Sequence, residues 1–154
     1  MSPESGGEAV IGLGIDLVEL DRFRAAWERR GERLLERIFT WHERRACLRR
    51  ADPVPELAVR FAAKEATFKA IGTGWRKGVR WVDVEVRNAP SGRPYLLVSG
   101  RVAEIASELG GRRLTVSLTH SAAMAAAQVL LLGAAGMAPW REAERIRAGE
   151  ERVG

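Results

Sequence analysis

Residues 60–74 read Arg-Phe-Ala-Ala-Lys-Glu-Ala-Thr-Phe-Lys-Ala-Ile-Gly-Thr-Gly, and this stretch decides which fold we expect. At 100° per residue, Leu57, Phe61 and Phe68 form one apolar stripe of a helix. A ridge of alanines at i, i+4 spacing covers the other side, at positions 58, 62, 66 and 70. Both faces predict packing, and the glycines that follow predict the helix end. The sequence therefore predicts a long central helix inside the fold.

Four charged side chains lie on this otherwise apolar helix. Arg60 and Lys64 project together, as do Glu65 and Lys69, because the members of each pair are one turn apart. Two exposed charge pairs, worth about 0.2–0.5 kcal/mol each, are the plain structural alternative. Burying charge without a partner or a task is costly. We therefore favour a functional site that these side chains form beside the turn at 72–74.

Composition limits the class of protein. With 154 residues, of which 46% are hydrophobic, the chain has enough apolar material for one domain with a real core. Its single cysteine, Cys47, excludes an intrachain disulfide and indicates a reducing compartment. No segment has the pattern of a signal peptide or a membrane span. We expect a soluble cytoplasmic protein that does not bind membranes.

Positive charge is concentrated in residues 21–50. This segment has ten arginines and five acidic residues, an excess of five that equals the net charge of +5 of the whole chain. Such a patch predicts an acidic partner, and the pattern alone leaves both nucleic acid and an acidic protein open. A third alternative is an ordinary solvated helix whose arginines cover the core.

Residues 10–18 alternate in the manner of a β-strand. One face carries the apolar residues Ile11, Leu13, Ile15 and Leu17, and the other carries Gly12, Gly14 and Asp16. Because the two glycines have no side chains, a neighbouring backbone or a ligand can approach beside the Asp16 carboxylate. A purely structural aspartate remains the alternative.

The other elements complete an α+β fold with a mostly antiparallel sheet. Asp21 predicts the cap of a helix that Gly31 interrupts, and Thr40 with Glu43 predicts a capping box for a helix ending near Asp52. Further strands are expected at 81–87, 95–99, 114–119 and 125–132, and a helix at 102–109.

The chemistry suggested by these residues is the binding of a metal ion and a polyphosphate. Asp16 and Glu65 provide two carboxylates in apolar surroundings, and Mg²⁺ characteristically takes one or two carboxylates and completes its shell from water and phosphate. The expected phosphate ligands are the side chains of Arg60, Lys64, Lys69 and His120, and backbone N–H groups of Gly72, Thr73 and Gly74. A histidine that only completes a loop is the alternative for His120.

Three blocks in this order also match a known family: Gly14-Ile-Asp16 with Arg22, then residues 60–74, then Ser117-Leu-Thr-His120. The chain resembles the holo-[acyl-carrier-protein] synthases, the short class of 4′-phosphopantetheinyl transferases. The similarity covers residues 9–132, which we expect to be the transferase domain, with extensions at 1–8 and 133–154. The family commonly has serine before the histidine, where this chain has Thr119.

The resemblance implies transfer of the 4′-phosphopantetheine group of coenzyme A to a serine of an acidic acyl carrier protein, with release of adenosine 3′,5′-bisphosphate. It implies that Asp16 and Glu65 bind Mg²⁺ and that Lys69 contacts the pyrophosphate. Arg60 and His120 are then further coenzyme A contacts. The base that accepts the serine proton stays open between Glu65 and a metal-bound water.

The resemblance also implies a homotrimer with active sites between subunits. Arg22 and its basic neighbours Arg24 and Arg29 are the expected carrier-protein docking face. Two other functions stay open as alternatives: a basic nucleic-acid-binding module, and a catalytically silent relative that acts as an interaction domain. The first leaves Asp16 and Glu65 without a role, and the intact Asp16, Glu65 and Lys69 argue against the second.

Overall fold

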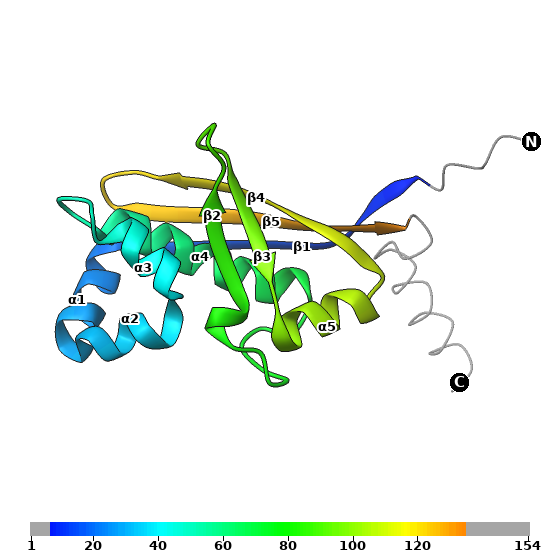
Figure 1. Cartoon of the computed structure of the whole chain (residues 1–154), viewed down its shortest axis with the longest axis horizontal. Helices are drawn as coiled ribbons and strands as arrows, with labels where there is room; N and C mark the ends of the chain where they lie inside the picture. Colours follow the sequence, from blue (N-terminus) through cyan, green and yellow to red (C-terminus); the bar gives the residue numbers. More distant parts are fainter. Residues whose placement is uncertain (1–6, 135–154) are drawn as a thin grey trace, which may run out of the picture.

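The structure is a computed structural model, and it describes residues 7–134. The α+β class and the antiparallel strand pairing are confirmed, as Figure 1 shows. The elements, in chain order, are β1 (Glu8–Glu19), α1 (Leu20–Arg30), α2 (Glu32–Ile38), α3 (Trp41–Cys47), α4 (Val54–Ala70), the 3-10 helix η1 (Trp81–Asp83), β2 (Val84–Asn88), β3 (Pro94–Val98), α5 (Gly100–Glu108), β4 (Gly111–His120) and β5 (Met124–Ala134).

The strands form two antiparallel sheets. The long sheet has the order β1-β5-β4, and β2 and β3 form a separate hairpin that stands across it (Figure 1). The predicted central helix is α4, which runs along one face of the long sheet and is buried on nearly all sides. The main core lies between α4, this sheet face and the helices α1 to α3.

Two glycines allow α4 to lie directly against β1. A Cβ atom on Gly12 would overlap the carbonyl oxygen of Ala70, and one on Gly14 would overlap the carbonyl oxygen of Ala66. Of the two neighbours that the sequence left open, a backbone or a ligand, the structure shows a backbone, that of α4. This close packing puts Asp16, two residues farther along β1, beside the carboxyl-terminal half of α4.

The opposite face of β1 is open in a single copy of the chain. Leu13, Ile15 and Leu17 are 55%, 60% and 63% exposed, although all three are large and apolar. Burial of such side chains favours folding or association by about 1.5–3 kcal/mol each. This exposed strip is therefore a surface suited to contact with another molecule.

Local predictions were partly correct. The capping box is confirmed, because the Thr40 hydroxyl accepts from the Glu43 N–H (3.3 Å) and the Thr40 N–H donates to the Glu43 carboxylate (3.1 Å). That helix ends at Cys47, earlier than predicted. Asp21 is not the cap of α1, since the helix begins at Leu20. No helix within residues 7–134 is long and apolar enough to cross a membrane.

Candidate functional site

Asp16 and Glu65 meet between β1 and α4. Burial, followed by the proximity and negative charge of Asp16, raises the pKa of Glu65 to about 8. The Oδ2 atom of Asp16 is buried and has no hydrogen-bond partner. The two carboxyl groups are thus close enough to compete for a proton or to share a cation. The convergence of Asp16 and Glu65 predicted from the sequence is present within one copy of the chain.

Lys69 completes this cluster one turn after Glu65. Its Nζ donates to Asp16 Oδ1 (3.0 Å) and to the carbonyl oxygen of Ile15 (2.9 Å), and its positive charge partly offsets the raised pKa of Glu65. The Lys69 side chain is 52% exposed. Its ammonium group is therefore accessible to a ligand that approaches the two carboxyl groups.

The residues of this cluster fit a magnesium ion. Mg²⁺ prefers oxygen ligands, keeps several waters, and is usually held by one or two carboxylates together with substrate phosphates. Asp16 and Glu65 supply two carboxylates, and the unpartnered Oδ2 of Asp16 is an available donor atom. Within residues 7–134 no group of three or more His, Cys, Asp or Glu side chains is arranged to hold a metal. The remaining ligands would have to come from water and substrate.

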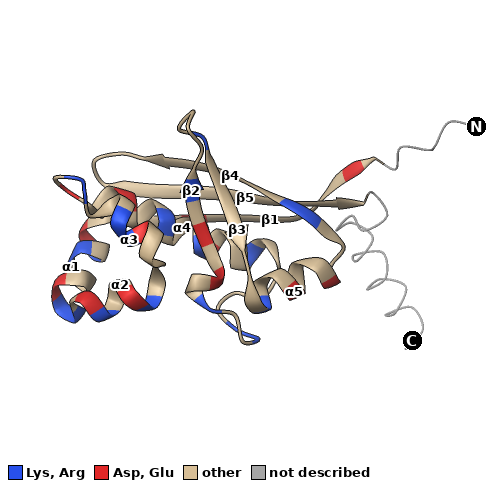
Figure 2. Cartoon of the chain, in the orientation of Figure 1, with Lys and Arg blue, Asp and Glu red and all other residues tan. Residues whose placement is uncertain are grey.

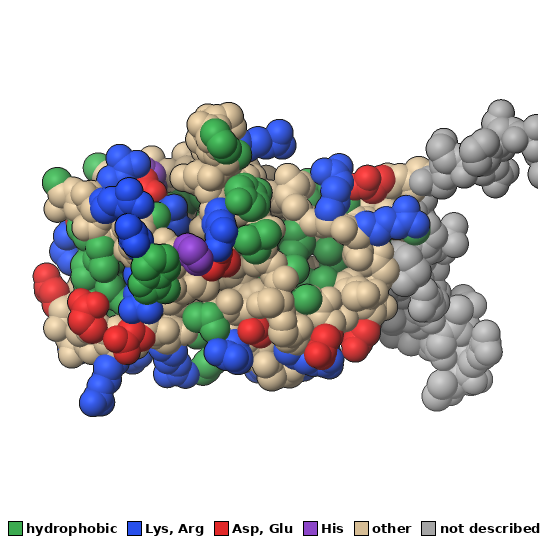
Figure 3. Space-filling model, viewed as in Figure 1, with side chains coloured by type: hydrophobic (Ala, Val, Ile, Leu, Met, Phe, Trp, Pro, Cys, Tyr) green, Lys and Arg blue, Asp and Glu red, His purple; other side chains and the backbone are tan. Residues whose placement is uncertain are grey.

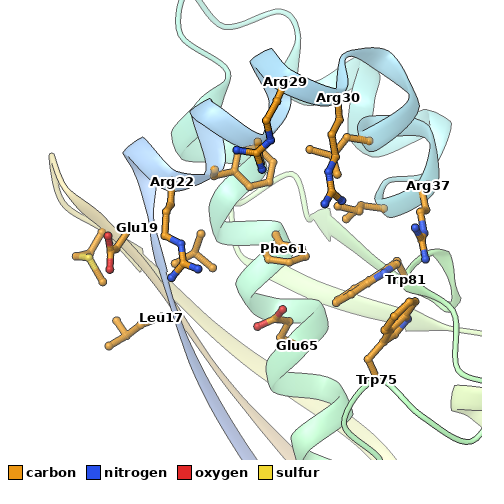
Figure 4. A pocket seen from close by; sticks show the side chains of 16 residues that line it. Leu17, Glu19, Arg22, Arg29, Arg30, Arg37, Phe61, Glu65, Trp75 and Trp81 are labelled. Carbon is orange, nitrogen blue, oxygen red and sulfur yellow. The ribbon is translucent and has the colours of Figure 1, made fainter.

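Glu65 also lines a cavity of about 680 Å³ beneath α1 and α2, shown in Figure 4. Four arginines line it from these two helices, namely Arg22, Arg29, Arg30 and Arg37. The rest of the lining is mostly apolar or aromatic, including Phe23, Ala26, Leu34, Ile38, Phe61, Trp75, Trp81 and Met124. The cavity therefore combines a cationic side with an apolar one, and the carboxylate cluster lies next to both.

The three arginines of α1 that are predicted to dock the carrier protein point in two different directions. Arg22 and Arg29 line the cavity, whereas Arg24 forms a two-point ion pair with Asp52 at 2.8 and 3.1 Å. Arg22 and Arg24 are two residues apart and so project about 200° apart around the helix. Figures 2 and 3 show that many charged residues gather at the end of the molecule formed by α1, α2 and α3. A count of charges in the sequence therefore could not tell which arginines face the cavity and which face Asp52.

The prediction that Lys64 binds the cofactor is wrong. Its side chain is 0% exposed, and Nζ donates to Glu43 (2.7 Å), to the carbonyl oxygen of Trp81 (3.2 Å) and to that of Val84. Burial lowers the pKa of Lys64, and the charge of Glu43 opposes the shift. Lys64 therefore ties α4 to α3 and to the start of β2, and no ligand can reach it.

Arg60 is also buried, and it lies on another face of α4. Its guanidinium donates to the Glu56 carboxylate (2.8 Å) and to the Glu56 carbonyl oxygen (3.2 Å), while Nε is buried without a partner. Five residues along a helix correspond to a rotation of about 140°, so Arg60 does not share a face with Glu65. Arg60 was predicted to contact coenzyme A, but within one copy of the chain it lies apart from the carboxylate cluster.

The backbone N–H groups of residues 72–74 form hydrogen bonds to the last turn of α4. The N–H of Gly72 donates to the carbonyl oxygen of Lys69, and the N–H groups of Thr73 and Gly74 both donate to that of Phe68, at 3.0 to 3.2 Å. Gly72 and Gly74 have φ angles of 75° and 54°, which favour glycine. In this structure these N–H groups cap α4, and their binding of phosphate stays a prediction.

His120 lies at the end of β4, where it is exposed. Asp16 and Leu118 both pair with Ala127 of the central strand β5, so His120 is two strands and two residues away from Asp16. Strand spacing and rise place their Cα atoms roughly 12 Å apart. The structure does not bring His120 to the carboxylate cluster within one copy.

The sequence reasoning missed part of the cavity. Trp75 and Trp81 form one wall, and Arg30 and Arg37 were counted only as part of the charge excess. The available signal for Trp75 was its place directly after Gly74, in the turn that follows the helix carrying Glu65. Glu43 was recognised only as a capping residue, although it is also the partner of the buried Lys64. Its second carboxylate oxygen accepts from the Val86 N–H.

A protein-family model described as the 4′-phosphopantetheinyl transferase superfamily matches residues 12–127. The chain belongs to this superfamily. It is 47% identical over 122 residues to a holo-[acyl-carrier-protein] synthase of Solibacter usitatus, which covers 79% of this chain and 98% of the relative.

Solved structures of holo-[acyl-carrier-protein] synthases support the same family assignment. The fold is similar to holo-[acyl-carrier-protein] synthase from Neisseria meningitidis, with a TM-score of 0.74, 30% identity, and coverage of 80% of this chain and 98% of that chain. It is also similar to the synthase from Bacillus anthracis, whose structure is a complex with CoA, with a TM-score of 0.68 and 35% identity over 81% of this chain and 98% of that chain. The resemblance found from three sequence blocks is confirmed.

Proposed function

We propose that this chain is a holo-[acyl-carrier-protein] synthase that transfers the 4′-phosphopantetheine group of coenzyme A to a serine of an apo acyl carrier protein. The observation that carries the proposal is the convergence of Asp16, Glu65 and Lys69 beside a cavity with a cationic side. The names of the relatives and the CoA complex of a similar structure support it. Residues 9–132 would form the transferase domain.

The reaction exchanges one phosphorus–oxygen bond for another. The serine oxygen forms a bond to the β-phosphorus as the bond from that phosphorus to the bridging oxygen breaks, and the bridging oxygen leaves with adenosine 3′,5′-bisphosphate. The serine proton goes to a base. Catalysis of this type depends mainly on positioning and on stabilising negative charge.

The residues of the cluster have distinct tasks in this proposal. Asp16 and Glu65 would hold Mg²⁺, and the chemistry that the ion supplies when bound is neutralisation of the diphosphate charge. Lys69, whose ammonium is already beside Asp16, would turn toward the diphosphate and donate to its oxygens. The raised pKa of Glu65 supports a carboxyl group that takes up a proton when no metal ion is bound.

The carrier protein would dock on the side of the cavity formed by α1. Arg22 and Arg29 line the cavity and extend toward it in Figure 4, so an acidic partner bound there would present its serine to Glu65. Arg24 would contribute little, because Asp52 already neutralises it. A nucleic-acid module would also use these arginines, but it gives no task to the carboxylate cluster.

We also propose that the protein acts as a homotrimer in the cytoplasm, with each active site between two copies. Two observations support assembly: the exposed strip of Leu13, Ile15 and Leu17 lies next to Asp16 on β1, and His120 is far from Asp16 within one copy. A neighbouring copy packed on this strip could supply its exposed His120 to the cluster. Sedimentation measurements would test the oligomeric state.

Intact mass spectrometry tests the proposed function directly. The protein would be mixed with coenzyme A, Mg²⁺ and an apo acyl carrier protein, and the carrier should gain the mass of one phosphopantetheine group. A carrier variant with alanine at the acceptor serine is the control. Unchanged carrier mass with several apo carriers would contradict the proposal.

A further inference from the structure

The cavity has an aromatic wall on the side away from Leu17. The rings of Trp75 and Trp81 are stacked, with centroids 5.7 Å apart and planes at 20°, and Phe61 packs against Trp81 at 5.1 Å. Figure 4 shows Trp75 and Trp81 side by side, with Glu65 and Phe61 facing the same space. The aromatic wall therefore belongs to the same cavity as the transfer site.

Trp75 is the outer member of this wall. It is 54% exposed, and the guanidinium of Arg37 lies 5.1 Å from its ring centroid. Trp75 is thus held between Trp81 and a cation rather than buried in the core. Its backbone belongs to the connection between α4 and η1, where Gly74, Lys77 and Gly78 have positive φ angles. Side-chain contacts, not a helix or a strand, keep this ring in place.

The chemistry of coenzyme A indicates which part would occupy the space inside this wall. The nucleotide carries most of the negative charge, whereas the pantetheine arm is neutral and ends in a thiol or a thioester. The arm remains bonded to the transferred phosphorus, which reacts beside the carboxylate cluster, so the arm needs a space that begins there. The cavity that Glu65 lines is such a space, and its wall of Phe61, Trp75 and Trp81 suits an uncharged chain.

We propose that Trp75 limits the size of the acyl group that coenzyme A thioesters can carry into this cavity. The inference rests on the proposed function and adds a substrate class to it, namely acyl thioesters whose acyl group reaches the Trp75 ring. The thioester bond is not broken, because the reaction at phosphorus is the same as with coenzyme A. Trp75 is here a specificity-determining residue and takes no part in the chemistry.

The test compares Trp75→Ala and Trp75→Phe with the wild-type protein, using coenzyme A, acetyl-CoA and octanoyl-CoA as donors. The chain offers a matched control in Trp41, which is 57% exposed and has Arg45 at 5.0 Å from its ring, but does not line the cavity. Trp75→Ala should raise the ratio of kcat/KM for octanoyl-CoA to that for coenzyme A by about tenfold or more, because apolar pockets discriminate by this amount. Trp75→Phe should change it less, and Trp41→Ala should leave it unchanged.

Calorimetric binding of the same donors separates this inference from the proposed function. Tighter binding of octanoyl-CoA relative to coenzyme A in Trp75→Ala would support the inference even if no carrier protein were modified, in which case only the transferase proposal would fail. A kcat/KM ratio and a binding ratio both within twofold of wild type in Trp75→Ala would overturn it. The same shift in Trp41→Ala would also overturn it, because the effect would then not come from the cavity.

Discussion

The two halves of α4 use the same residue types for different purposes. Lys64 is fully buried and bonded to Glu43 and two carbonyl oxygens, whereas Lys69, five residues later, is half exposed and contacts Asp16 beside the cavity. The residue pattern is nearly the same, a lysine within an alanine-rich apolar helix. The surroundings differ, because Lys64 faces α3 and β2 whereas Lys69 faces the end of the glycine-lined strand β1.

This comparison teaches that a charge on an apolar helix indicates a task but does not identify it. Burying an ion pair costs several kcal/mol of desolvation per ion, which only good geometry and further hydrogen bonds offset. The pair of Lys64 and Glu43 meets this condition within the fold. The pair of Asp16 and Glu65 does not, because two like charges are brought together with one oxygen unpartnered.

The largest expected effect comes from removing one carboxylate of the cluster. Glu65→Gln should lower kcat for phosphopantetheine transfer by on the order of a thousandfold, because the diphosphate loses its charge stabilisation at the site. The circular dichroism spectrum should not change. Glu104→Gln on α5 is the control and should retain full activity, since this residue is exposed and away from the cavity. Near wild-type transfer by Glu65→Gln would exclude Glu65 as a metal ligand.

Replacing the buried lysine should affect folding instead. Lys64→Met leaves the Glu43 carboxylate buried without its cation, so the free energy of unfolding should fall by about 3–5 kcal/mol. Lys69→Met should cost less than about 1 kcal/mol, because this ion pair is half exposed, and should lower activity instead. Urea denaturation of the two variants measures the difference. Equal losses of stability would break the comparison between the two halves of α4.

Much of the fold was predictable because local signals and periodicity agree. The alternation in β1, the two packed faces of α4 and the Thr40 capping box all correspond to observed elements. The meeting of Asp16 and Glu65 was also predictable, since Gly12 and Gly14 leave space for a close neighbour beside Asp16, and the backbone of α4 occupies that space.

The rest depended on tertiary contacts. The sequence does not show that the N–H groups of Gly72 and Thr73 are consumed in capping α4, because a glycine turn that caps a helix and one that binds phosphate have the same composition. It also does not show that Lys64 meets Glu43, since these residues are joined only when α3 packs on α4.

A smaller effect is expected at the cationic side of the cavity. Arg22→Glu should raise the KM for the acyl carrier protein by about tenfold with little change in kcat, because it places a like charge in front of an acidic partner. Arg24→Glu is the matched control on the same helix, and its KM should change little because Arg24 is turned toward Asp52. An unchanged KM for Arg22→Glu with a lower kcat would contradict the docking role.

A further expected effect is a pH dependence of stability. In the presence of a chelator, the pKa of Glu65 is about 8 in the folded protein and about 4.5 in the unfolded chain. Between these values the folded state binds more protons, so this group makes stability fall as the pH rises from about 4.5 to about 8. The Glu65→Gln variant should not show this decrease in stability between about pH 4.5 and about pH 8. Parallel curves of unfolding free energy against pH for the two proteins would contradict the raised pKa.

The central claim, that Asp16 and Glu65 hold one divalent cation together, is tested most directly by titrating Mg²⁺ into the protein with coenzyme A in a calorimeter. Wild type, Asp16→Asn, Glu65→Gln and the double variant would be compared at pH 8. The account predicts one ion per chain in wild type, and the same loss of affinity in either single variant as in the double variant. Wild-type affinity in either single variant, or losses that simply add, would contradict it.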